Sequence, residues 1–155
     1  MQVVPVAELS DHVGTETGRS AWFTIDQERI DRFADVTEDH QWIHVDADAA
    51  SRGPFGATIA HGFLTLSLVS ALSTEAAIQP EGAGMLINYG SDRVRYLHPV
   101  RVGSRIRTVS TLKDVSEKAP GQILLTSTVV VEIEGEERPA LVADILTLAF
   151  MAPAS

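Results

Sequence analysis

The chain has 155 residues, of which 45% are hydrophobic and 21% are charged, so it is long enough for one compact domain with a single sizeable core. Its 12 Lys and Arg against 21 Asp and Glu give a formal net charge of −9, which opposes nonspecific binding to nucleic acids and to anionic membrane surfaces. Cysteine is absent, which excludes a disulfide framework, a thiolate metal site and a cysteine nucleophile.

The ends and the apolar stretches of the chain show no sign of export or membrane insertion. Residues 1–10 have neither the basic nor the apolar region of a signal peptide, so we expect a cytoplasmic protein. The longest apolar stretch, residues 60–74, is shorter than the ~20 residues that span a bilayer and is typical of a buried helix. Without repeats or a linker, residues 1–155 are expected to form one domain.

The first helix is predicted from a capping box, Thr24 to Gln27, with Thr24 as the N-cap. Apolar residues then recur at helical spacing, which predicts a helix from about Asp26 to Val36. Asp39 and His44 follow it, and on a continuous helix at ~100° per residue their side chains would point about 140° apart. The segment must therefore turn if these two side chains are to meet.

A cluster of chain breakers, residues 52–56, separates this segment from a second helix that is expected to begin near His61. That helix is apolar nearly all round, so it must be covered on most sides. Four β-like runs follow, at residues 85–97, 104–116, 122–134 and 140–151, and they predict an antiparallel meander. A curved sheet around one apolar helix would bury both the helix and the apolar side of the strands. The sequence therefore predicts an α+β fold.

The chemistry-bearing residues are Asp39, His44 and the backbone amide of Gly62 at the start of the apolar helix. An imidazole changes protonation state near neutral pH, and a helix N-terminus can stabilise a developing negative charge. A lone Asp or His in a polar loop is, however, usually a turn former or a solvated group. His40 and His44, at i and i+4, could also indicate a metal site. We expect no metal, because a turning segment need not place those two imidazoles on one face.

Three segments together resemble the MaoC-like dehydratases, the family of (R)-specific enoyl-CoA hydratases with a hot-dog fold. They are Asp39, His44 and Asp46; residues 58–63, Thr-Ile-Ala-His-Gly-Phe; and residues 96–103, Tyr-Leu-His-Pro-Val-Arg-Val-Gly. The resemblance spans roughly residues 10–150. Glu38 stands where a glycine is common, and Gln41-Trp42 replaces Asn-Pro, so substrate choice is the property that these departures affect.

The resemblance implies an enzyme that adds water to trans-2-enoyl thioesters and yields (R)-3-hydroxyacyl thioesters. Asp39 and His44 would be catalytic, and the Gly62 amide would polarise the thioester carbonyl. His61 would make a structural hydrogen bond or contact the substrate, and Ser70, about two helical turns after Gly62, would approach the aspartate. Asn88 would line the pocket.

The family also implies a homodimer that acts in fatty acid metabolism on thioesters of coenzyme A or acyl carrier protein, without a cofactor. Arg93 and Arg95 either face solvent or meet the phosphates of coenzyme A. Two alternatives remain: an acyl-CoA thioesterase on the same fold, and a noncatalytic acyl-thioester-binding subunit of a dehydratase complex.

Overall fold

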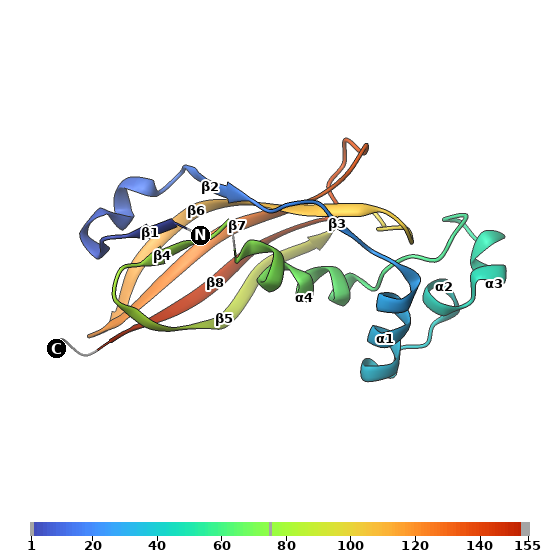
Figure 1. Ribbon diagram of the computed structural model, residues 1–155, viewed down its shortest axis with the longest axis horizontal. Coiled ribbons are helices and arrows are strands. Elements are labelled where there is room, and N and C mark those ends of the chain that lie inside the picture. The colour runs from blue at the N-terminus through green and yellow to red at the C-terminus, as the bar shows by residue number, and fades with distance from the viewer. Residues whose placement is uncertain (1, 75, 153–155) are drawn as a thin grey trace.

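The computed structural model describes residues 2–74 and 76–152, in which a long antiparallel sheet packs against one central helix (Figure 1). In chain order the elements are β1 (Gln2–Val4), the 3₁₀ helix η1 (Val6–His12), β2 (Glu16–Arg19), β3 (Phe23–Thr24), α1 (Gln27–Thr37), α2 (Trp42–Val45), α3 (Ala47–Ser51), α4 (Gly62–Ser73), β4 (Ile78–Pro80), β5 (Ala83–Tyr96), β6 (Arg105–Ala119), β7 (Gln122–Ile133) and β8 (Leu141–Met151). No described helix is long and apolar enough to cross a membrane.

The main sheet has the strand order β2-β6-β7-β8-β5, and β3 pairs with the first two residues of β6. All four predicted long strands are confirmed to within a few residues. The predicted meander is correct only for β6, β7 and β8, because β5 pairs with β8 and not with β6. Alternating hydrophobicity decides which face a side chain takes, but it does not specify the neighbouring strand. β5 therefore forms an edge of the sheet.

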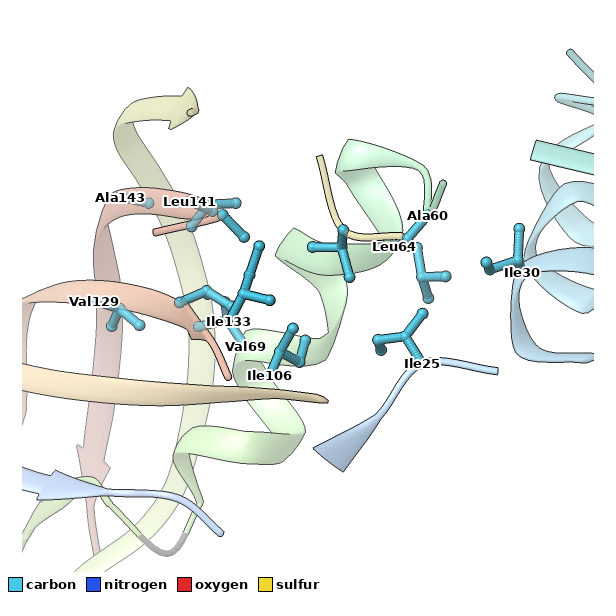
Figure 2. Packing of buried hydrophobic residues seen from close by; sticks show 13 residues of the cluster. Ile25, Ile30, Ala60, Leu64, Val69, Ile106, Val129, Ile133, Leu141 and Ala143 are labelled. Atoms are coloured by element: carbon cyan, nitrogen blue, oxygen red, sulfur yellow. The ribbon is translucent and has the colours of Figure 1, made fainter. Parts of the chain in front are cut away.

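The core lies between α4 and the face of the sheet that it covers, here called the inner face. Leu64 and Val69 of α4 pack in one cluster with Val129 of β7 and Leu141 of β8 (Figure 2). Along β7 the residues at 123, 125, 129, 131 and 133 are buried, as the alternation of the sequence predicts. The sheet covers one side of α4, where Leu64 and Val69 are buried, whereas Phe63 on the same helix is 70% exposed, so the coverage on most sides that the apolar sequence predicts is not complete within one chain.

The helix α1 begins at Gln27, and its N-cap is Asp26 rather than the predicted Thr24. The Asp26 side chain accepts a hydrogen bond of 2.9 Å from the Arg29 backbone N–H, whereas Thr24 belongs to β3. Aspartate is as good an N-cap as threonine, and it lies closer to the helix. In Figure 1, α1, α2 and α3 lie together beyond the end of the sheet, beside the start of α4.

Candidate active site at the N-terminus of the central helix

Asp39, His44 and His61 meet where the connection between α1 and α2 turns back toward α4. Glu38 ends α1 with φ 61° and ψ 19°, the left-handed conformation that a glycine would adopt without cost. A carboxylate oxygen of Asp39 and one ring nitrogen each of His44 and His61 lie within 4.8 Å of one another. Asp39 is exposed, and both histidines are buried. The turn that convergence of Asp39 and His44 requires is therefore present.

His44 is held as a neutral base by its surroundings. Its Nδ1 lies 2.7 Å from the carbonyl oxygen of Ile59, and since a carbonyl only accepts, Nδ1 carries the proton and Nε2 is left as an acceptor. Burial lowers the pKa of His44, and the nearby His61 adds to this, whereas the bond to Ile59 and the Asp39 charge oppose it. A neutral imidazole near pH 7 can take a proton from a bound water.

His61 contacts both members of the Asp39–His44 pair. Its ring stacks on His44 with centroids 3.7 Å apart and planes 24° apart. Its Nε2 donates to the main-chain oxygen of Asp39 at 2.9 Å, while its buried Nδ1 has no hydrogen-bond partner among the described residues. The structural hydrogen bond expected of His61 thus runs to the backbone of Asp39, between α1 and α2.

Gln27 is a supporting residue that the sequence did not indicate. Its Nε2 donates to the His44 main-chain oxygen at 2.8 Å, and its Oε1 accepts from the Thr58 hydroxyl at 2.5 Å. Gln27 thereby ties α1 to α2 and to the segment before α4. The capping box assigned this side chain to its own helix, and only the folded chain shows the longer contacts.

Gly62 is the first residue of α4, and the N-cap residue His61 provides no side-chain cap. The first N–H groups of a helix have no acceptor within the helix and carry the positive end of its dipole. A Cβ at Gly62 would lie 3.0 Å from the ring of Tyr96, so only glycine fits without a shift of that ring. Gly62 also lines a cavity of about 250 Å³ with Tyr96 and Thr65. This arrangement suits a negatively charged oxygen at the helix N-terminus.

Comparison with known proteins decides the family. A model of the MaoC-like domain matches residues 8–134. The chain belongs to the MaoC-like dehydratase family. It is 47% identical, over 90% of this chain and 91% of the relative, to a protein of Mycobacterium tuberculosis named 3-hydroxyacyl-thioester dehydratase Z. It is 46% identical, over 96% and 92%, to nodulation protein N of Rhizobium leguminosarum.

The fold of this MaoC-like protein is the hot-dog fold, as the resemblance predicted. An R-hydratase of Pseudomonas aeruginosa superposes with a TM-score of 0.71 over 96% of this chain and 87% of that one, at 23% identity. The predicted enzyme class, hydro-lyase, is the class to which dehydratases belong.

The histidines of this MaoC-like site are arranged poorly for a shared metal ion. The nitrogen lone pairs lie in the ring planes, and these planes are 24° from parallel with centroids 3.7 Å apart, which is unfavourable for both nitrogens to bind one ion at about 2.0–2.1 Å. His40, considered with His44 as a ligand pair, is exposed, and its Nε2 lies 3.1 Å from an Asp35 oxygen. The expectation of no metal stays a prediction.

Four other predicted residues are not part of the Asp39–His44–His61 cluster within one chain. Ser70 and Asn88 line a separate cavity under the second half of α4. Arg93 donates from Nε to the buried Asp144 at 2.6 Å, so its charge already has a partner. Arg95 is exposed and donates to the neighbouring Val94 carbonyl, and its predicted contact with coenzyme A stays a prediction.

Proposed function

We propose that this MaoC-like protein is an (R)-specific enoyl-thioester hydratase, which also runs in reverse as a dehydratase. The observation that carries the proposal is the convergence of the Asp39 carboxylate and a ring nitrogen of His44 within 4.8 Å, beside the first turn of α4. Two hydrogen bonds of about 2.8 Å each span this distance, so one water molecule fits between the two groups. The relative from M. tuberculosis, named a 3-hydroxyacyl-thioester dehydratase, supports the same reaction class.

The chemistry follows from the protonation states. His44 Nε2 takes a proton from the water as its oxygen bonds to C3 of the trans-2-enoyl thioester, and the π electrons move toward the carbonyl. The thioester oxygen becomes negative and is held by the Gly62 N–H at the helix N-terminus. The Asp39–His44 pair then returns a proton to C2. The net change is addition of H and OH across C2=C3, giving the (R)-3-hydroxyacyl thioester.

We expect the proposed enzyme to be a homodimer. β5 is an edge strand of the sheet, and most of its 14 residues are exposed, including Met85, Ile87 and Tyr89. A long exposed apolar edge is a site for strand pairing. A homodimer formed along β5 would cover it. Membership of fatty acid metabolism, a cytoplasmic location and the choice between coenzyme A and acyl carrier protein stay predictions.

The decisive test measures loss of the enoyl absorbance of crotonyl-CoA, with free thiol assayed in the same tubes. We expect wild type to consume the enoyl group without releasing thiol. Asp39→Asn and His44→Gln should each lower turnover by more than ~100-fold, because each removes one of the groups that hold and deprotonate the water. Circular dichroism checks that the variants fold.

The matched control is His40→Gln, which changes an exposed histidine of the same segment and should leave turnover unchanged. Near-normal rates in a folded Asp39→Asn or His44→Gln protein would refute the assigned roles. Thiol release by wild type would indicate the thioesterase instead. The absence of any reaction with every thioester would favour the noncatalytic subunit.

A further inference from the structure

A second cavity, of about 310 Å³, lies between the C-terminal half of α4 and the inner face of the sheet. Val69 and Val129, which face each other across this layer in Figure 2, belong to its wall. The reaction proposed above uses none of the residues that line it. The proposed reaction therefore leaves this cavity without a function.

The wall of this cavity is rich in uncharged hydrogen-bonding side chains, of which Ser70, Thr74 and Asn88 are exposed at its open side. Seven such side chains line it: Ser70 and Ser73 from α4, Thr74 directly after it, Asn88 from β5, Ser110 from β6, Ser127 from β7 and Thr147 from β8. Outside the cavity the same face of these strands is apolar at Leu112 and Leu125, whereas Thr108 of β6 adds another buried hydroxyl without a partner among the described residues. Among the described residues that line the cavity, none is charged. These side chains form a row of uncharged polar groups under α4.

Two of these hydroxyls are buried without a partner. Ser110 is only 2% exposed, and the Oγ atoms of Ser110 and Ser73 have no hydrogen-bond partner within the described part of the chain. A buried hydroxyl without a partner costs free energy, and most buried polar groups in proteins are paired. Ser110 and Ser73 come from opposite walls, one from the sheet and one from the helix. A ligand oxygen in the cavity would offer these hydroxyls a hydrogen-bond partner.

The cavity lies along the helix that carries the proposed oxyanion donor. Ser70 follows Gly62 by eight residues, which places it about 12 Å farther along α4 at 1.5 Å per residue. Extended acyl chains of medium length have this reach. Val69, Val129 and Ile145 offer apolar surface for methylene groups, and the serines offer hydrogen bonds at the distal end.

We propose that this cavity receives the distal part of the acyl chain and selects chains that carry an uncharged oxygen there, such as a hydroxyl. The inference rests on the proposed hydratase function and adds a substrate class to it. A plain alkyl chain would displace water and leave the hydroxyls unpaired, and sites built to hydrogen-bond a substrate hydroxyl discriminate strongly against analogues that lack it. A chain ending in a carboxylate would meet no cation in this wall.

The test compares kcat/KM for trans-2-decenoyl-CoA and for 10-hydroxy-trans-2-decenoyl-CoA, which differ only in the terminal hydroxyl. Wild type should prefer the hydroxylated chain by at least about tenfold. The double variant Ser110→Ala/Ser73→Ala should lose this preference, because the two unpaired hydroxyls are removed. Thr126→Val, on the same strand as Ser127 but facing the other side of the sheet, should keep it.

Crotonyl-CoA separates the two proposals, because its chain is too short to reach Ser70. The double variant should hydrate crotonyl-CoA at the wild-type rate, which also shows that it folds. Hydration of crotonyl-CoA together with equal or better use of plain decenoyl-CoA by wild type would overturn the assignment of the cavity. A preference that survives in the double variant would overturn the role of these hydroxyls. Failure to hydrate any enoyl thioester would instead remove the proposed function itself.

Discussion

At the scale of single residues, the site depends on two imidazoles in contact, of which one is proposed to do chemistry. His44 has its Nδ1 committed to the Ile59 carbonyl, so its reactive nitrogen is fixed as Nε2. His61 stacks on that ring and holds the Asp39 backbone. We therefore interpret His61 as a positioning residue that holds the two proposed catalytic residues, Asp39 and His44, in place, rather than as a group that reacts.

The pH dependence of kcat/KM tests the state of His44. Burial lowers its pKa, so the neutral form persists below the ordinary value of 6.5, and activity should fall only when the pH drops well under that value. His61→Phe keeps a flat ring but removes the neighbour that helps to lower the His44 pKa. In this variant the acidic limb should move to higher pH, and turnover should fall about tenfold because the Asp39 carbonyl loses its donor.

His40→Gln serves as the control for this profile, since that exposed histidine should not affect it. An acidic limb at or above pH 6.5 in wild type would contradict a buried, neutral base. If the acidic limb of the kcat/KM profile were unchanged in His61→Phe, His61 would contribute only packing and not affect the His44 pKa.

At the scale of elements, the edge strand β5 is attached to the sheet by a charged cluster on the outer face. Asp144 of β8 is 4% exposed and accepts hydrogen bonds from Arg93 of β5, Lys113 of β6 and Thr128 of β7. Arg93 has φ 50° and lies where the β5–β8 register shifts. Burial alone would raise the pKa of Asp144, but the bonds from Lys113, Thr128 and Arg93 outweigh it and lower that pKa.

Urea unfolding tests how this cluster supports β5. Arg93→Met or Lys113→Met alone should lower the free energy of unfolding by at most about 1 kcal/mol, because both cations are partly exposed and one remains to pair the carboxylate. The double variant leaves a buried, unpaired carboxylate and should lose about 3 kcal/mol or more. Adding Asp144→Asn to the double variant should recover most of that loss. Additive effects of the two single changes would contradict a shared carboxylate.

The sign of the pH effect follows from the lowered pKa of Asp144. The stability that this carboxylate contributes is present above its ordinary value of 3.8 and is lost as the pH falls through the lower folded-state value. Wild type should therefore lose more stability between pH 5 and pH 2 than the variant that lacks all three charged groups.

At the scale of the whole molecule, the sheet is unequal at its two edges. β2, at one edge, has four residues, whereas β5, at the other, has 14 and exposes Met85 at 50% and Tyr89 at 47%. Charged residues on one edge would normally prevent strand pairing between copies, but apolar side chains dominate this part of β5. The proposed dimer therefore uses β5 and leaves the β2 edge free.

Sedimentation at micromolar concentration tests this assembly. Wild type should sediment as a dimer, and Met85→Lys/Ile87→Lys should sediment as a monomer because like charges would face each other at the interface. Val36→Lys, which changes a side chain of α1 that is 80% exposed, should remain dimeric. A monomeric wild type, or a dimeric double variant, would contradict the role of β5.

Sequence alone determined the two longer helices, α1 and α4, the four long strands and the buried side of β7, because turn chemistry and hydrophobic period are local properties. It also indicated Asp39, His44 and Gly62, since their spacing and the segments around them resemble a known family. Only the tertiary structure decided that β5 pairs with β8, that Gln27 ties His44 to Thr58, and that His61 stacks on His44. The same holds for the row of hydroxyls under α4. These contacts join residues far apart in the chain, and the packing of the whole core, rather than any local preference, selects them.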